Sequence, residues 1–177
     1  MVCKVSFLVV SFLLFAAFSY AISVEELNTI CRQTTNPSFC FALLNSHHSK
    51  NLISLTQYTI EIARANVTNT IKVINSLITQ SKKNAEAQNH YTLCLEHFSS
   101  NGGALTLIDY TKQVLKNHDY EGVNVAASAI LTNVDNCIYG DSPSDPLYKD
   151  TSILPHYVAT IEVVIQIILV ISNKLLH

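Results

Sequence analysis

The segment 50–83 most constrains the fold, because it contains no glycine or proline and its apolar residues recur at steps of mostly three and four. This spacing places the apolar side chains on one face of an amphipathic helix. The stripe consists of Leu55, Tyr58, Ile62, Ala65, Val67, Ile71, Ile74 and Ile78. The pattern predicts one helix of about 30 residues, which must pack against partners along its length to bury that face.

The rest of the chain repeats this helical pattern. Apolar residues recur at helical spacing over 87–98 and again over 123–137, while 163–171 is apolar on nearly all sides, as is typical of a central helix. Gly102 and Gly103 predict a break after the second long helix, which resumes over 104–117.

Glycine and proline number only four each, and no segment alternates cleanly between apolar and polar residues. The sequence therefore predicts an all-α fold, with an up-down-up-down four-helix bundle over residues 50–177. The polar loop 139–150 precedes the last helix, which we expect to begin near Thr151.

A short helical hairpin is predicted in front of the bundle, over residues 22–46. Ser23 and Glu26 fit a capping box that opens a helix running to about Gln33. Asn36 can cap a second helix with Pro37 in its first position. Both helices are too short to be stable alone in water, so the hairpin needs a further constraint.

The first residues fit a secretory signal peptide rather than part of the fold. Lys4 precedes an apolar run from Val5 to Phe18, and small residues lead to Ala21. A membrane anchor is the alternative, but the apolar run is short for a span of roughly 20 residues. We therefore expect residues 1–21 to be removed and residues 22–177 to form a single domain.

The charge of that domain argues against two classes of partner. Loss of Lys4 leaves ten basic residues against thirteen acidic ones, a net charge of −3. A value this small gives no electrostatic case for binding nucleic acid or an anionic membrane.

Four of the five cysteines lie in the predicted mature chain, and an even number in a secreted protein indicates disulfides. Three pairings are possible. Cys31 and Cys40 flank the hairpin corner, whereas Cys94 and Cys137 lie on the apolar faces of neighbouring long helices. We favour Cys31–Cys40 and Cys94–Cys137, because any other pairing leaves the hairpin unstapled. In the loop-entropy account they contribute about 2.5 and about 4 kcal/mol.

Other functional signals are sparse. Asn66-Val67-Thr68 is an N-glycosylation sequon, which either carries a glycan or stays unused inside a packed helix. No motif for a catalytic nucleophile, a zinc protease or a phosphate-binding loop is present. We expect no catalytic residue and no cofactor.

A metal site is not predicted either. His47 and His48 are adjacent and diverge on a helix, while His90 and His97 need ligands from a facing helix. Asp141 and Asp145 lie in a loop without a calcium-binding pattern.

The tyrosines at 58, 91 and 157 have helical spacing and are expected in the core. For 163–171, a membrane span or a lipid-anchor tail is the disfavoured alternative to a central helix.

Several stretches resemble the plant invertase/pectin methylesterase inhibitor family. They are "ICRQTTNPSFC", "YTLC", "HDYEGVNVAASAILTNVDNC" and "ISNKLL", and together they extend over nearly the whole predicted mature chain. The resemblance implies a four-helix bundle behind a helical hairpin, with the same disulfide pairing. It also implies stoichiometric inhibition of a carbohydrate-active enzyme of the cell wall or vacuole by covering its substrate cleft.

The resemblance favours pectin methylesterase as the target. Invertase inhibitors of the family can carry Pro-Lys-Phe in the turn where this chain has His118-Asp119-Tyr120-Glu121. Two departures stand out: Cys137-Ile138-Tyr139-Gly140 in place of the common Cys-Glu-Asp, and Asn101-Gly102-Gly103 as an apparent insertion in a normally continuous helix. If the helix with the insertion faces the target, inhibition would be weakened or lost.

The sequence therefore predicts a secreted protein of the apoplast or cell wall, with the vacuole as a second location. We expect it to bind pectin methylesterase 1:1 and to be no enzyme. Acid invertase is the alternative target, and a secreted helical signalling ligand is the alternative from another functional class. The sequence does not identify the residues that contact the target.

Overall fold

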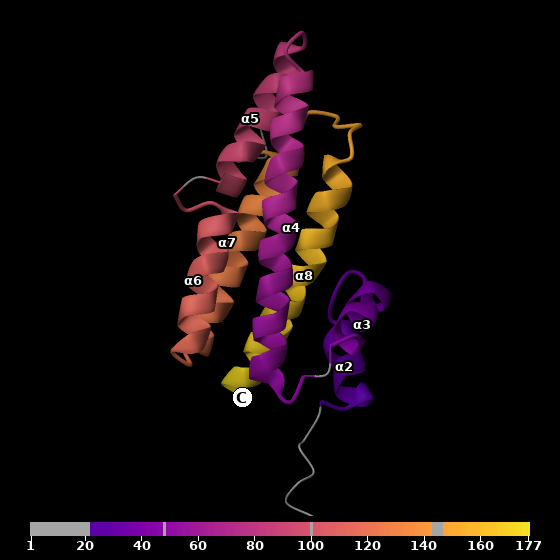
Figure 1. Cartoon of the computed structure of the whole chain (residues 1–177), viewed down its shortest axis with the longest axis vertical. Coiled ribbons are helices and arrows are strands. Elements are labelled where there is room, and N and C mark those ends of the chain that lie inside the picture. The colour runs from indigo at the N-terminus through magenta and orange to yellow at the C-terminus, as the bar shows by residue number, and fades with distance from the viewer. Residues whose placement is uncertain (1–21, 48, 100, 143–146) are drawn as a thin grey trace, which may run out of the picture.

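The computed structural model describes residues 22–47, 49–99, 101–142 and 147–177, and within these ranges it contains helices and no strand. The predicted signal peptide 1–21, His48, Ser100 and Asp145 lie outside the described residues. The helices are α2 (Val24–Cys31), α3 (Pro37–Asn45), α4 (Leu52–Gln80), α5 (Ala85–Ser99), α6 (Ala104–Lys116), α7 (Tyr120–Tyr139) and α8 (Leu154–Leu176) (Figure 1).

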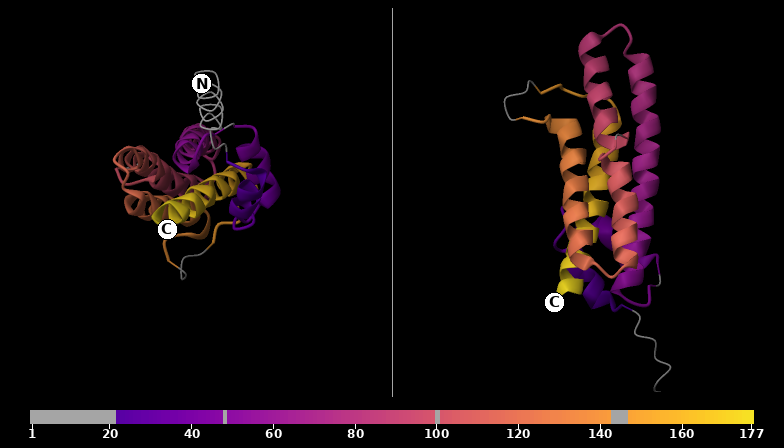
Figure 2. Two further views of the ribbon diagram at one scale, coloured as in Figure 1. Left: turned by 90° about the horizontal axis from the view of Figure 1, so that it is seen from below. Right: turned by 90° about the vertical axis from the view of Figure 1, so that its left-hand side faces the viewer.

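Four rods form the bundle, and successive rods run in opposite directions. Helix α4 is the first, α5 and α6 together form the second, α7 is the third and α8 is the last (Figures 1 and 2). Helices α2 and α3 form a hairpin that packs beside α8 (Figure 1). The predicted all-α fold, a four-helix bundle preceded by a hairpin, is confirmed.

Side-chain caps set where the helices begin. Ser23 Oγ accepts a hydrogen bond from Glu26 N, and Asn36 Oδ1 accepts one from Phe39 N. Asn51 and Ser54 form a reciprocal capping box at the start of α4. Because these side chains satisfy backbone N–H groups that have no partner inside a helix, polar residues at these positions fix the helix starts.

Two helix ends differ from the sequence prediction. Helix α2 ends at Cys31 rather than near Gln33. At this end, the Thr34 hydroxyl donates to the Cys31 carbonyl at 2.8 Å. Helix α8 begins at Leu154 rather than near Thr151. The Asp150 side chain accepts from Ser152 N and holds a turn there, which delays the helix.

Both disulfides join the predicted pairs. Cys31 is bonded to Cys40 across the hairpin, with their Cα atoms 5.4 Å apart. Cys94 of α5 is bonded to Cys137 of α7, with their Cα atoms 4.4 Å apart. The first bond closes the corner between two short helices, and the second ties two bundle helices together.

The buried face of α4 is rotated from the predicted stripe. Ala65 is exposed and Tyr58, Ile62, Ile71 and Ile78 are only half-buried. Threonines occupy three of the core positions instead, namely Thr56, Thr59 and Thr70. Each hydroxyl donates to the carbonyl four residues earlier, so the polar atom is satisfied within the helix and the methyl group faces the core.

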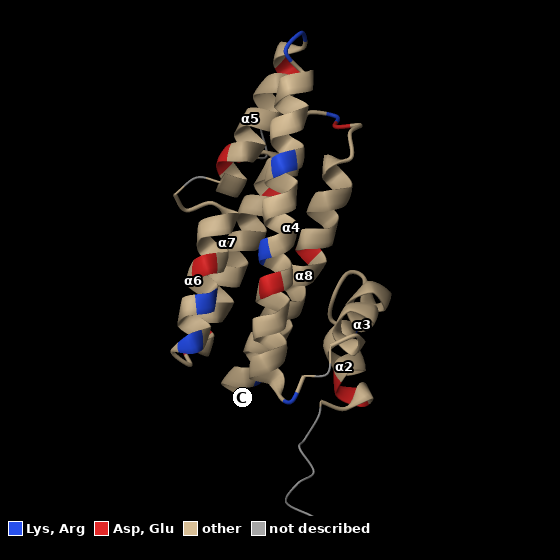
Figure 3. Ribbon diagram, viewed as in Figure 1, with Lys and Arg blue, Asp and Glu red and all other residues tan. Residues whose placement is uncertain are grey.

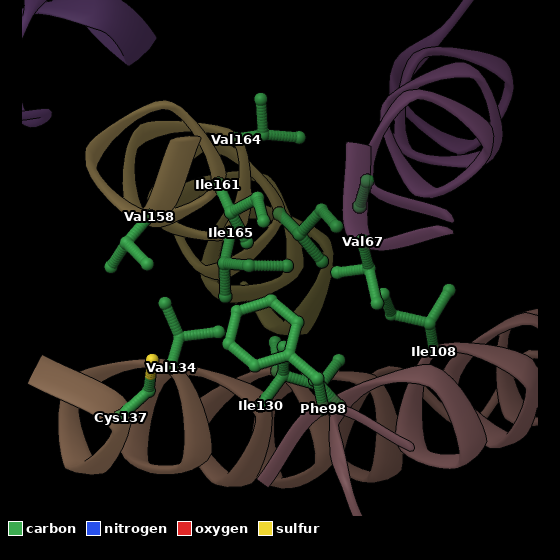
Figure 4. Packing of buried hydrophobic residues seen from close by; sticks show 14 of the residues in the cluster. Val67, Phe98, Ile108, Ile130, Val134, Cys137, Val158, Ile161, Val164 and Ile165 are labelled. Atoms are coloured by element: carbon green, nitrogen blue, oxygen red, sulfur yellow. The ribbon is translucent and has the colours of Figure 1, made fainter. Parts of the chain in front are cut away.

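The predicted break in the second rod lies between Ser99 and Ala104. Gly102 has a φ of +114°, which an L residue rarely adopts, and Gly103 is the N-cap of α6. The rod continues past the break because Phe98 and Ile108, one on each side of it, are both buried in the same core (Figure 4). The break therefore interrupts the rod without ending the bundle.

Helix α8 is buried on two sides. Ile161, Val164 and Ile165 pack in the bundle core with residues such as Phe98 and Ile130 (Figure 4). Val163, Ile167 and Ile171 instead pack against the hairpin, with Leu27, Ile30 and Leu44. Two opposite contacts explain why 163–171 is apolar on nearly all sides.

By length and composition, α8 alone among the described helices could cross a membrane. However, 56% of its most apolar window is buried inside the protein. The burial on both sides identifies α8 as the core helix of this bundle rather than a lipid-facing span.

Candidate functional site

The surfaces of the bundle differ in how much they leave open to a partner. The hairpin covers one side of α8, and Thr35 fastens it there, since both its backbone N–H and its hydroxyl donate to Gln166 Oε1 at 2.8 and 2.9 Å. This side of α8 is already occupied within the chain.

The face formed by α4 and α6 is polar and internally paired. Arg64 Nε lies 2.8 Å from Asp109 Oδ1, and Lys112 Nζ pairs with Glu61 Oε1. Figure 3 shows that both helices carry acidic and basic residues along their length. All four side chains are about half exposed, so the pairs are screened by solvent and contribute little to stability.

A groove of about 360 Å³ opens on a different side, between α5, α7 and the segment that leads into α8. Its apolar part includes Leu93 of α5 and Leu147 of the loop, which are 45% and 67% exposed. Tyr139, at the end of α7, is 60% exposed and follows Ile138 of the groove lining. Exposed aliphatic and aromatic side chains around a depression are typical of a protein-binding surface.

Polar residues form one end of this groove. His97 Nε2 lies 3.3 Å from Asp141 Oδ1, and His97 Nδ1 lies 3.4 Å from Asn133 Oδ1. Asn136 Nδ2 donates to the same Asp141 oxygen at 2.9 Å. These contacts attach the start of the loop after α7 to α5.

A second polar cluster holds the other end of the loop. Tyr91 donates its hydroxyl to Asp150 Oδ1 at 3.0 Å, and His90 Nε2 lies 3.7 Å from Asp150 Oδ2. The Asp150 side chain is only 4% exposed. The Tyr148 ring lies on His90, with ring centroids 4.6 Å apart.

Burial dominates the acid–base behaviour of this cluster. It lowers the pKa of His90, against the opposing charge of Asp150, because the imidazolium is poorly solvated there. Burial also raises the pKa of Tyr91 to about 12, although a hydrogen bond with Ser152 opposes it. The tyrosine is therefore a neutral hydrogen-bond donor at physiological pH.

The structure places the predicted site residues as follows. His90 and His97 share the groove, but each faces a carboxylate, and the described residues contain no group of three metal-binding side chains. Tyr91 is buried as expected, whereas Tyr157 is half-buried and Tyr58 stacks on His47 with ring centroids 3.9 Å apart.

Asn66 lies within α4, half-buried, and its Nδ2 donates to the Ile62 carbonyl at 2.9 Å. Its glycosylation stays a prediction. An attached glycan would take one of the two Nδ2 hydrogens and leave the other for this hydrogen bond.

Sequence reasoning missed the groove. Leu93 and Leu147 are ordinary leucines in the sequence, and Asp150 is one of several loop carboxylates. They come together only when α5 and the loop before α8 pack side by side, so local sequence carries no signal for them. The one available hint was His90 and His97, seven residues apart on one helix.

The family model for the plant invertase/pectin methylesterase inhibitors matches residues 25–156. Pectinesterase inhibitor 1 of Arabidopsis thaliana is 33% identical over 165 residues, which is 93% of this chain and 90% of that protein. A pectinesterase inhibitor of Actinidia deliciosa is 34% identical over 152 residues, with 84% of this chain and 78% of the relative covered.

Solved structures show the same relationship. The crystal structure of mutant form A of a pectin methylesterase inhibitor from Arabidopsis superimposes with a TM-score of 0.70 at 31% identity, covering 84% of this chain and 95% of that one. A crystal structure of a pectin methylesterase inhibitor from Arabidopsis thaliana gives a TM-score of 0.63, also at 31% identity. This chain therefore belongs to the plant invertase/pectin methylesterase inhibitor family.

Proposed function

We propose that this protein inhibits pectin methylesterase by non-covalent 1:1 binding that covers the substrate cleft of the enzyme. The observation that carries the proposal is the similarity to pectinesterase inhibitors over nearly the whole chain. The alignment with one of these relatives covers 93% of this chain. The family consists of inhibitors, and the bundle provides a rigid surface held by a disulfide, with a second disulfide in the hairpin.

The mechanism is steric. A bundle whose helices are tied by a buried core and by Cys94–Cys137 loses little conformational entropy when it docks. A standard interface of about 1,600 Å² would hold the complex and exclude the polymeric substrate from the cleft. No covalent bond to the enzyme needs to form or break.

We place the groove between α5 and α7 in this interface. It combines exposed apolar side chains with polar side chains of fixed position, whereas the α4–α6 face satisfies its charges internally and the hairpin side of α8 is covered. The groove is also next to the interrupted second rod, so the insertion at 101–103 bears on how tightly the enzyme is held.

Acid invertase is the second candidate target. The turn between α6 and α7 argues against it, because its residues are engaged within the chain. His118 has a φ of +59° and its Nδ1 lies 3.1 Å from the Tyr120 hydroxyl, while Asp119 caps α7 by accepting from Gly122 N. The side chains of His118 and Asp119 are thus engaged within the turn, and the turn has no counterpart of the Pro-Lys-Phe of invertase inhibitors.

We further propose that residues 1–21 direct the chain into the secretory pathway, are removed there, and leave the protein in the cell wall. Two disulfides fit an oxidising compartment of this kind.

The test is an activity assay with two enzymes. Purified secreted protein is added in increasing amounts to a plant pectin methylesterase and, separately, to an acid invertase, and residual activity is followed. We expect loss of the esterase activity and full retention of the invertase activity. Inhibition of invertase alone would make invertase the target. If neither enzyme is inhibited, the proposal is wrong.

A further inference from the structure

A second groove, of about 260 Å³, lies where the hairpin meets the start of the bundle. It is lined by the beginning of the hairpin, the end of the hairpin and the first turn of α4. Its lining residues are Ile22, Val24, Leu27, Asn45, His47, Ser49 and Leu55. The groove therefore brings the start of the described chain next to the linker between hairpin and bundle.

Two polar features in this groove concern Ile22 and Ser49. The backbone N–H of Ile22 donates to the Ser49 carbonyl, with the nitrogen and oxygen 3.5 Å apart. Ser49 is 6% exposed, and its Oγ has no hydrogen-bond partner among the described residues. A buried hydroxyl without a partner costs free energy, so a donor is expected to reach it in the working protein.

Ile22 is the first residue after the predicted signal cleavage site. Hydrolysis of the Ala21–Ile22 peptide bond by a signal peptidase consumes one water molecule. It leaves a carboxylate on Ala21 and an amine on Ile22, and this amine takes up a proton below its pKa. The nitrogen that donates one hydrogen bond as an amide becomes an ammonium group with three N–H donors.

We propose that Ser49 is a binding site for the α-ammonium group of mature Ile22. The Ser49 carbonyl keeps the contact seen in the uncleaved chain, and Ser49 Oγ accepts a second hydrogen bond. The Ile22 side chain packs against the cluster formed by the hairpin and α8, which keeps the nitrogen in the groove. Capture of a chain terminus by a few backbone and side-chain groups is a recurring mode of recognition.

The charges around the groove are of both signs. The positive end of the α2 dipole opposes it, but Glu25 and Glu26 lie in the first turn of that helix and offset the dipole. Glu26 also forms an ion pair with Lys174 of α8, whose Nζ lies 3.8 Å from Glu26 Oε1. On the linker side, His47 lines the groove and Lys50 is exposed next to Ser49.

Cleavage would in this way fasten the start of the hairpin to the linker before α4. The inference depends on removal of residues 1–21 and not on the identity of the target enzyme. The charged ammonium group makes the stronger hydrogen bonds, so the fastening is fully present at acidic and neutral pH and weakens as pH rises through the pKa of the bound amine.

The test uses the full chain secreted by a eukaryotic host, with the N-terminus of the purified product determined by mass spectrometry. The pKa of the α-amine is read from the pH dependence of its reaction with a trace of acylating reagent. We expect Ile22 as first residue and a pKa above the ordinary range of about 7.7–8.0. Ser49→Ala should return it to that range, while the control Ser38→Ala, at an exposed serine of α3, should not.

A second variant changes no existing side chain: Gly-Ser is inserted between Ala21 and Ile22, so that the amine lies outside the groove. Its Tm should be about 2 °C below that of the unmodified product at pH 6, and the difference between the two should be smaller at pH 10. A product that begins at another residue, an α-amine with an ordinary pKa, or equal Tm values at pH 6 would each overturn the proposal.

Discussion

Two carboxylates that face each other across α7 and α8 show how a single residue pair sets pH behaviour. Asp135 and Glu162 are both half-buried, and burial raises the pKa of each. The Asp135 charge raises the pKa of Glu162 further. Because the folded state binds these protons more tightly than the unfolded state, the pair stabilises the fold at low pH. That stabilisation is lost as pH rises through the raised pKa values.

Glu162→Gln should therefore increase stability at pH 7 and have little effect at pH 3.5, where the wild-type carboxyl is already protonated. The glutamine amide can donate to Asp135 without adding a second negative charge. We expect a Tm gain of about 2 °C at pH 7, measured by thermal denaturation. Glu96→Gln, at an exposed residue of α5, serves as the matched control. An equal gain at both pH values would contradict the account.

Single residues also mark where sequence reasoning stopped. The helix caps at Ser23 and Asn36 follow from residue type and local spacing, because their partners are three residues away. Thr59 and Thr70 were not assigned to the core, since a hydroxyl counts as polar in any periodicity pattern. Only the hydrogen bond to the carbonyl four residues earlier makes these threonines suitable for burial.

At the scale of elements, the break between α5 and α6 depends on one backbone conformation. Gly102→Ala leaves the new methyl group in open space, since no atom lies within 4 Å of it, but a φ of +114° is strained for any L residue. We expect a loss of about 1–2 kcal/mol, measured by urea denaturation. Asn101→Ala, in the same exposed turn, should change stability by less than about 0.5 kcal/mol. Equal losses for the two variants would show that backbone strain is not the cause.

The hairpin is a second element with its own stability. Its cluster with α8 is separate from the main bundle core, and Cys31–Cys40 constrains only its corner. Replacing both cysteines by alanine should cost about 2.5 kcal/mol. In hydrogen exchange, the loss of protection should be confined to residues 22–46, with α4 to α7 unchanged. Loss of protection throughout the bundle would instead show that the hairpin and the bundle unfold as one unit.

The elements themselves were largely predictable, because helical periodicity and glycine positions are local signals. The rotation of α4 and the two-sided burial of α8 were harder to predict. The rotation of α4 depends on how it packs against α5, α6 and α8. The burial of α8 depends on where the hairpin docks, and that contact joins Leu27 and Ile30 to residues such as Ile167 and Ile171, far away in the sequence.

At the scale of the whole molecule, the groove between α5 and α7 should determine binding of the enzyme. Leu93→Asp and Leu147→Asp each place a charge on an exposed apolar position of the groove without disturbing the core. We expect each to weaken inhibition by about tenfold or more, as for a residue near the centre of an interface. Val24→Asp makes the same change on the hairpin, at a residue that is 58% exposed, and should leave inhibition intact. Weakening by Val24→Asp alone would move the interface to the hairpin.

The central claim is that the folded bundle blocks pectin methylesterase by forming a 1:1 complex with it. The most direct measurement is a titration at an enzyme concentration well above the Kd, with residual activity recorded against the molar ratio of the two proteins. The account predicts a linear fall that ends at one equivalent. Undiminished activity with several equivalents of correctly disulfide-bonded protein would contradict it.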